Sequence, residues 1–245
     1  LLTFVCTGFC TGGQILLSQQ VGAKKHEEMQ KTIGTLFSFT MLSAIVLGVL
    51  SIALHNNLLR LLNTPESAFD EAAKYMVICN SGCIFIFGYN ALCSILRGMG
   101  DSKRPLLFVA IASVINLILD LIFVAGLGLG AGGAAIATVF AQGVSAVLVV
   151  LALCRSKDIF RLELKQVRFH RDALELLLKI GLPAGLQSVM YSASNIIIQT
   201  SLNSFGTNTM AAWTAYGKID SFFWMVISAF GISITTFVGQ NYGAR

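Results

Sequence analysis

Two polar side chains interrupt an otherwise apolar run, residues 105–126, which reads PLLFVAIASVINLILDLIFVAG. Asn116 and Asp120 are four residues apart, so on a helix they lie one turn apart on the same face, together with Ser113. A charged side chain in the middle of a bilayer costs about 2.5–3.5 kcal/mol on insertion scales, so it must face a protein interior or a water-filled cavity. There it can bind a proton, or a Na⁺ ion together with an oxygen of Asn116. We therefore expect Asp120 to bind a cation; a structural hydrogen bond between helices is the alternative.

The following apolar segment carries a second polar face. Thr138, Gln142 and Ser145 are spaced by four and three residues, which places them on one side of a helix. Their oxygens could join those of Asn116 and Asp120 around one cavity, and Gln142 could also line a substrate cavity. Small polar contacts between packed helices are the alternative interpretation.

A third polar face, in residues 180–202, has no charge. Its members are Ser188, Tyr191, Asn195 and Gln199. An uncharged face of this kind suits the lining of a broad substrate cavity, with polar packing between helices as the alternative. In the last apolar segment Asp220 is a further candidate for this cavity. Lys218 is two residues away, hence on the opposite face, and cannot pair with Asp220 within the helix.

The composition indicates that these side chains belong to a membrane protein. Of the 245 residues, 55% are hydrophobic and 12% are charged, about half the charged share of an average soluble domain. Seven apolar segments are long enough to cross a bilayer as helices, and no series of short alternating strands is present. They cover residues 1–17, 32–54, 72–96, 106–126, 133–154, 180–202 and 210–238. We therefore predict an all-α polytopic bundle of about seven transmembrane helices.

The basic residues predict how the segments are oriented. Fourteen of the 17 Lys and Arg residues fall in loops that alternation places on one side, which the positive-inside tendency makes cytoplasmic. Arg60 and Lys74 fall on the opposite side, and Lys218 lies within the last segment. The basic residues flank membrane spans, where they meet the membrane lipid. They therefore do not indicate a nucleic-acid partner.

Patterns typical of catalysis and of structural metal sites are missing from the sequence. The six cysteines form no C-x-x-C pair, and the sequence contains no H-E-x-x-H, G-x-S-x-G or Walker motif. We therefore expect neither an enzyme nor a cofactor. The small ion that we expect the protein to bind is a coupling ion, and Na⁺ at Asp120 is one candidate.

A short repeat indicates a duplication. Residues 18–24 read SQQVGAK, residues 239–245 read GQNYGAR, and each follows an apolar segment that enters the same predicted side. Copies at equivalent positions of two bundles suggest a parallel duplication, a common plan among transporters. The polar loop 155–172 lies between the two bundles. Because the first residue lies inside an apolar segment, we expect the chain to be a fragment of a longer protein.

Three ordered motifs resemble those of the multidrug and toxic compound extrusion (MATE) family. They are LRGMGDSKRP at 96–105, NLILD at 116–120 and GLGLGAGGAAIAT at 126–138, and AAWTAYGKIDSFFW at 211–224 fits the same family. The resemblance implies a two-lobed transporter of twelve helices. It divides the chain into part of the N-terminal lobe at 1–154 (helices 2 to 6, without helix 1), the interlobe loop at 155–172 and the start of the C-terminal lobe at 173–245 (helices 7 and 8).

The resemblance also implies a set of cation-binding residues. In members with a cation site in the N-terminal lobe, the positions that match Tyr75, Asn116, Asp120 and Thr138 join an acidic residue of helix 1, which lies outside this chain. Other members have a Glu in helix 7, eight residues after a Pro. Here that position is Tyr191, which follows Pro183, so a site of that second kind is not expected.

The expected function is therefore that of a cation-coupled antiporter. The resemblance implies an H⁺- or Na⁺-driven exporter of organic, often cationic or amphipathic compounds, which acts as a monomer in the cell membrane by alternating access. A lipid-linked oligosaccharide flippase of the same superfamily is one alternative, although Lys218 is a single intramembrane base for holding phosphates. A membrane sensor or scaffold without transport is the other alternative.

Overall fold

The computed structural model describes residues 2–61, 66–155, 167–203 and 205–245, and every element in these ranges is a helix. The all-α prediction is therefore confirmed for the described part of the chain. In chain order the elements are α1 (Leu2–Gly22), α2 (His26–Ala53), α3 (His55–Leu61), α4 (Glu66–Ser81), α5 (Cys83–Gly98), α6 (Lys103–Asp120), η1 (Leu121–Gly126), α7 (Gly130–Arg155), α8 (Arg171–Asn203) and α9 (Thr207–Gly243).

The predicted apolar segments correspond to helices that run side by side. Among the described residues, five helical stretches are individually long and apolar enough to cross a membrane, namely those of α2, α6 with η1, α7, α8 and α9. The pair α4 and α5, bent by 46° at its break, is long and apolar enough when taken together to be a sixth candidate span. The seventh predicted segment corresponds to α1, which has 21 residues but includes the polar Gln14, Ser18, Gln19 and Gln20.

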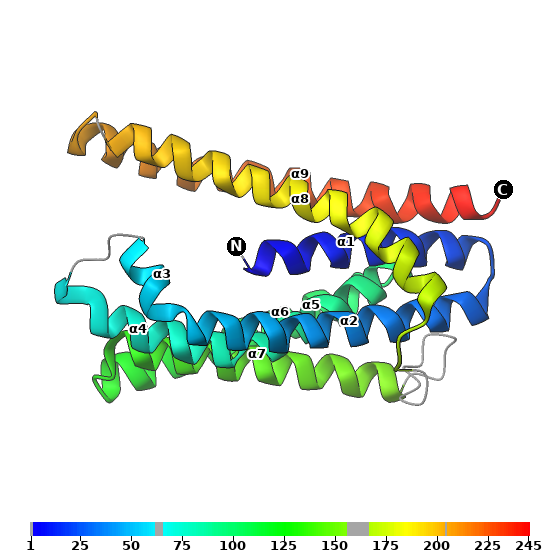
Figure 1. Ribbon diagram of the computed structural model, residues 1–245, viewed down its shortest axis with the longest axis horizontal. Coiled ribbons are helices and arrows are strands. Elements are labelled where there is room, and N and C mark those ends of the chain that lie inside the picture. The colour runs from blue at the N-terminus through cyan, green and yellow to red at the C-terminus, as the bar shows by residue number, and fades with distance from the viewer. Residues whose placement is uncertain (1, 62–65, 156–166, 204) are drawn as a thin grey trace.

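α1 lies at the centre of the bundle, between the pair α8 and α9 on one side and the helices α2 to α7 on the other (Figure 1). Leu17 of α1 is fully buried in a core that also contains Ile33 of α2, Leu96 of α5 and Leu153 of α7. Helices that are apolar on most of their surface pack in this way when a membrane surrounds them. The core thus joins α1, α2, α5 and α7 into one unit.

Two pairs of glycines fix α8 against α1. Gly8 and Gly12 are four residues apart on α1, and Gly181 and Gly185 are four apart on α8. A Cβ at Gly8 would overlap the Cα of Gly185, and a Cβ at Gly12 would lie 2.7 Å from the Cα of Gly181. Without side chains the two backbones touch, which is the close approach that G-x-x-x-G motifs permit between membrane helices.

The break between α4 and α5 lies directly against α7. Gly82 stands at the break, and a Cβ there would lie 2.6 Å from a methyl group of Val139 on α7. α7 can therefore pack into the bend. On α6, the α-helical hydrogen bonding ends at Asp120 and a π-helical turn, η1, begins at the next residue. Such wider turns inside membrane helices often accompany functional sites.

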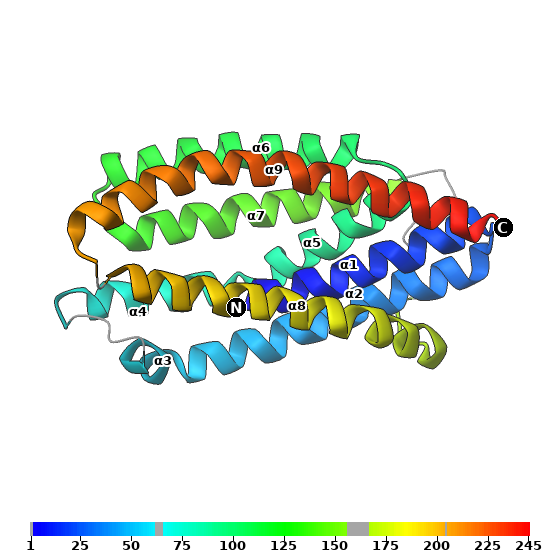
Figure 2. The same cartoon turned by 90° about the horizontal axis from the view of Figure 1, so that it is seen from above.

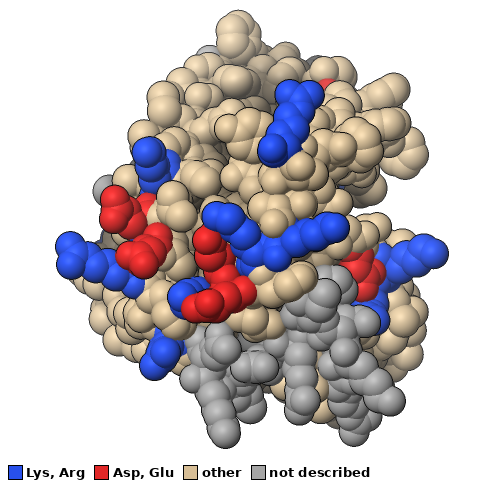
Figure 3. Space-filling model, turned by 90° about the vertical axis from the view of Figure 1, so that its right-hand side faces the viewer, with Lys and Arg blue, Asp and Glu red and all other residues tan. Residues whose placement is uncertain are grey.

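Basic residues gather at one end of the bundle. The turn between α1 and α2, the turn between α5 and α6, the start of α8 and the C-terminus all lie at the right-hand end of Figure 1, and Figure 3 faces that end, where Lys and Arg spread over the surface. The α6–α7 and α8–α9 hairpins turn at the opposite end (Figure 2). The described loops therefore alternate between the two ends as the distribution of basic residues predicted.

Candidate cation site and the exposed surface of α8 and α9

Asn116 and Thr138 meet between α6 and α7. The side-chain amide of Asn116 donates from Nδ2 to Oγ1 of Thr138 over 3.5 Å, and both side chains are half-buried. The Thr138 hydroxyl in turn donates to the backbone oxygen of Ala134 over 2.9 Å, one turn back on α7. Because its own proton is committed to the helix, Thr138 presents lone pairs to Asn116. This chain of bonds orients the Asn116 amide.

Asp120 lies one turn beyond Asn116, at the last residue of α6. Its Oδ1 atom is buried and accepts no hydrogen bond from the described part of the chain. The ion pairs among described residues join Lys25 to Glu28, Lys31 to Glu27, Lys74 to Glu71 and Arg104 to Asp101, and Asp120 takes part in none of them. A buried carboxylate oxygen without a partner is costly, so it favours the uptake of a cation.

Tyr75 approaches the same carboxylate from a third helix. It lies on α4 with its hydroxyl beside the thiol of Cys79, and is close enough to Asp120 for the two groups to interact electrostatically. Tyr75 is 42% exposed. The structure thus joins Asn116 of α6 to Thr138 of α7 by a direct bond one helical turn from Asp120, and it places Tyr75 of α4 within electrostatic reach of Asp120.

The remaining members of the two N-terminal polar faces lie differently. Ser145 is fully buried and donates to the backbone oxygen of Phe108 over 3.3 Å, which joins α7 to α6. This is the packing role that was the alternative for that face. Gln142 is half-buried, and Ser113 is exposed on α6. Thr138 is the member of the face formed by Thr138, Gln142 and Ser145 that a hydrogen bond places beside Asn116.

The polar face of α8 lies along an open surface. Tyr191 is 54% exposed and meets the ring of Trp224 on α9 edge-on, with 6.1 Å between the ring centroids. Asn195 and Gln199 are exposed, whereas the hydroxyl of Ser188 donates to Ala184 within α8 over 3.0 Å. These residues share a surface but do not converge on one point.

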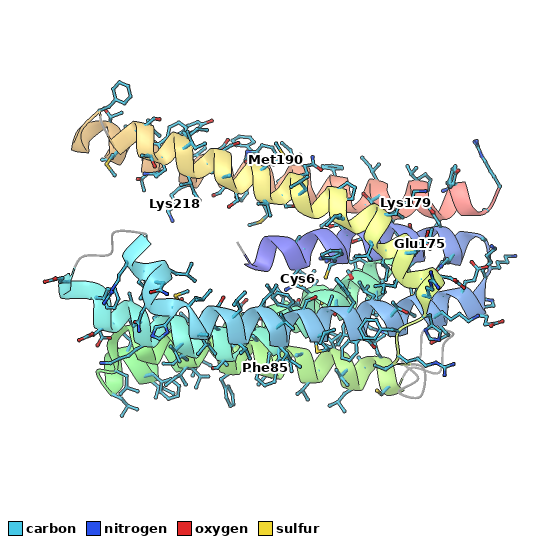
Figure 4. The ribbon with its side chains drawn as sticks, viewed as in Figure 1. Cys6, Phe85, Glu175, Lys179, Met190 and Lys218 are labelled. Atoms are coloured by element: carbon cyan, nitrogen blue, oxygen red, sulfur yellow. The ribbon has the colours of Figure 1, made fainter. Side chains whose placement is uncertain are left out.

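α9 carries the other two intramembrane charges singled out in the sequence. Asp220 accepts a hydrogen bond of 3.3 Å from the hydroxyl of Tyr216, one turn earlier on the helix. Figure 4 shows Lys218 pointing from α9 toward the end of the other helices that carries α3. Lys218 is exposed.

Three polar residues that the sequence analysis did not single out join α9 to the other helices. Gln14 of α1 donates from Nε2 to Oγ1 of Thr236 over 3.0 Å, and Gln240 donates to the backbone oxygen of Gly98 over 3.3 Å. The sequence feature that could have identified Gln14 is its polar side chain in the middle of an apolar segment. Thr236 and Gln240 are four residues apart, hence on one face of α9.

The fold and the site define a polytopic helical membrane protein in which one oxygen of a half-buried carboxylate, Oδ1 of Asp120, is buried without a hydrogen bond from the described residues. The sequence profile of the MatE family matches residues 1–122 and 183–245 of this chain, so the chain belongs to the MatE family of membrane transporters. This is a family of transporters and not of enzymes, which confirms the expectation that the chain is not an enzyme.

Two relatives from Bacillus subtilis (strain 168) are named probable multidrug resistance proteins. YoeA is 31% identical over 252 residues, which cover 100% of this chain and 54% of YoeA. YpnP is 32% identical over 228 residues, which cover 93% of this chain and 51% of YpnP. The chain thus spans about half the length of these relatives.

Solved transporter structures share the helix arrangement. A multidrug resistance MATE family transporter of the MOP superfamily in an outward-facing conformation matches with a TM-score of 0.90 and 23% identity, over 99% of this chain and 55% of the other. An inward-facing conformation matches with a TM-score of 0.78 and 22% identity, over 98% of this chain and 52% of the other. The helices of this chain are therefore arranged more nearly as in the outward-facing structure.

Proposed function

We propose that this chain forms part of a cation-coupled exporter of drug-like compounds, in which Asp120 binds H⁺ or Na⁺. The observation that carries the proposal is the buried Oδ1 atom of Asp120, which has neither an ion pair nor a hydrogen bond among the described residues. Asn116, Thr138 and Tyr75 orient or complete the ligand set from α6, α7 and α4. MATE transporters are ion-coupled, which agrees with this assignment.

In the proposed transporter, residues 1–154 belong to the N-terminal lobe, residues 155–172 to the loop between the lobes and residues 173–245 to the C-terminal lobe. The basic end of the bundle faces the cytoplasm, because positively charged loops are retained on that side. The complete transporter acts as a monomer. The open surface with Tyr191, Asn195 and Gln199, together with Gln142, Ser188 and Asp220, lines the route of the exported compound.

The coupling requires that the cation binds the two conformations with different affinity. A ligand that binds both conformations equally shifts nothing, however tightly it binds. The arrangement of this chain supports an outward-facing state in which the far ends of α8 and α9 stand apart from the first helices. In that state the carboxylate of Asp120 is loaded from outside, and its loading biases the lobes toward the other state.

Transport by the full-length protein in proteoliposomes tests this function. We expect an imposed H⁺ or Na⁺ gradient to drive accumulation of a fluorescent organic cation, and an ionophore for the coupling ion to stop it. Transport that persists without either gradient, or no transport of any organic cation with either gradient, would contradict the proposal. A sensor or scaffold gives the second of these results.

Two hydroxyl residues of α7 separate ligand effects from packing effects. Because Thr138 bonds Asn116 within the proposed site, Thr138→Val should weaken the apparent affinity for the coupling ion about threefold to tenfold, the value of one hydrogen bond. Ser145→Ala removes a bond between helices instead, and should lower stability by about 0.6 kcal/mol with unchanged ion dependence. Transport against ion concentration and the thermal unfolding midpoint measure the two effects. A reversed pattern would remove Thr138 from the site.

A further inference from the structure

The two copies of the sequence repeat lie against each other at the basic end of the molecule. The C-terminal ends of α1 and α9, which carry residues 18–24 and 239–245, run side by side there in both ribbon views (Figures 1 and 2). Each residue of the second copy lies 221 positions after its counterpart in the first. The repeat is therefore not only a trace of duplication, because its copies form a contact.

The contact has a local two-fold symmetry. A Cβ at Gly22 would overlap the backbone oxygen of Gln240, and a Cβ at Gly243 would overlap the backbone oxygen of Gln19. Gly243 and Gln240 are the counterparts of Gly22 and Gln19, so these are one contact made twice. Ser18 touches its own counterpart, Gly239. Only residues without a side chain allow the helices to approach so closely.

Partly buried hydrogen bonds join the same end of α9 to α1 and to the end of α5. Gln14, whose side chain is 4% exposed, donates to Thr236, and the Thr236 hydroxyl donates to the backbone oxygen of Arg97 over 3.0 Å. Gln240 donates to the oxygen of Gly98 over 3.3 Å. Such bonds add modest stability when made, but their donors must find water when the helices separate.

The opposite end of α9 has no comparable contact in the described part of the chain. A Cβ added at Gly217 or at Gly206, the residue before α9, would meet nothing within 4 Å. Phe222 and Phe223 on the same half of the helix are largely exposed. α9 is thus held at its basic end and free of α1 at its other end, which is the geometry of a molecule closed on one side.

We propose that the two repeat copies form a latch, made by Ser18, Gln19 and Gly22 with Gly239, Gln240 and Gly243, that closes the cytoplasmic side and separates once in each transport cycle. The latch rests on the proposed exporter function, since only alternating access requires it to open. Two of its contacts bring a glycine of one helix against a backbone oxygen of the other, and the third brings the Ser18 side chain against Gly239. It is therefore specific in geometry and reversible when water enters.

Distance measurements between spin labels in the full-length transporter test the latch. Labels are placed at exposed His26, beside the end of α1, and at exposed Tyr242, beside the end of α9, in a background without other cysteines. We expect a short distance to dominate in the parent protein. Gly22→Ala and Gly243→Ala should each lower the ratio of short to long distances about tenfold, because each adds a methyl group to a closed contact. Two-fold symmetry requires the two effects to be similar.

Gly143→Ala is the matched control, since it makes the same change within a helix where the nearest atom, in the ring of Phe85, lies 3.8 Å from the added carbon. Its distances should match those of the parent. Gln14→Leu, which removes the bonds from Gln14 to Thr236 and to the backbone oxygen of Ile232, should shift the ratio in the same direction as the glycine variants. If both glycine variants fail to fold, Gln14→Leu decides the question.

Unchanged distances in folded Gly22→Ala and Gly243→Ala, or in Gln14→Leu where the glycine variants do not fold, would overturn the latch. A shift in one glycine variant and not in the other would overturn its symmetry. The distances are measured without an ion gradient and without a transported compound. A failed latch and a failed exporter assignment therefore give different results.

Discussion

Asp120→Asn is expected to lower cation-driven export by the full-length transporter strongly while leaving its fold intact. Asparagine has almost the shape of aspartate but carries no charge and takes up no proton at neutral pH. The coupling between ion and substrate would then be lost, which corresponds to a fall of about 5- to 150-fold in the ion-dependent part of transport. Gradient-driven accumulation of a fluorescent organic cation in proteoliposomes measures it. Because Oδ1 has no partner in the described structure, the substitution breaks no bond that holds the helices together.

Asp70→Asn provides the matched control for this prediction. Asp70 lies exposed on α4, and the same chemical change there should leave transport unchanged. Undiminished, gradient-dependent transport by Asp120→Asn at normal protein levels would show that the coupling ion binds elsewhere, and the assignment of Asn116, Thr138 and Tyr75 would be lost with it.

Gly12→Val is expected to lower the stability of the protein strongly. The added side chain would meet the backbone of Gly181, 2.7 Å from the position of its Cβ, and a backbone cannot turn aside as a side chain can. Overpacking at such a contact costs on the order of 3 kcal/mol. We expect a lower yield of monodisperse protein and a lower midpoint of thermal unfolding, measured by size-exclusion chromatography after heating.

Gly143→Val separates this clash from the general effect of a larger, β-branched residue in a helix. The nearest atom to its added Cβ, in the ring of Phe85, lies 3.8 Å away, so the substitution should cost much less. Equal midpoints for Gly12→Val and Gly143→Val would mean that α1 and α8 do not touch through their glycines in the complete protein.

The sequence was sufficient to predict the helices and the alternation of their loops between the two ends of the bundle, because each of these predictions came from a local pattern. Apolar runs of membrane length predicted the spans, and the basic loops predicted which ends lie together. Asp120 could also be recognised from a local pattern, because a carboxylate is costly in an apolar membrane helix and therefore indicates a function. The residues of other helices near Asp120 were harder to predict. The family resemblance indicated Thr138, and the hydrogen bond from Asn116 to Thr138 shows that these two residues lie side by side.

Other features could not be predicted because they depend on which helices meet. Residues 8–12 and 181–185 read GFCTG and GLPAG, which are both G-x-x-x-G motifs, but neither motif indicates its partner. The repeat at 18–24 and 239–245 indicated duplication, whereas the contact between its copies required the helices to be placed. The π-helical turn after Asp120 has no pattern in LIFVAG that distinguishes it from ordinary helix.

Cation binding by the full-length protein at equilibrium tests the central claim most directly. Purified protein without substrate is titrated with radioactive Na⁺, and in weakly buffered solution the protons that it takes up or releases on substrate addition are recorded. The account predicts saturable binding or substrate-linked proton release in the parent protein and in Asp70→Asn, and neither in Asp120→Asn. Equal binding or release by the parent protein and by Asp120→Asn would contradict it.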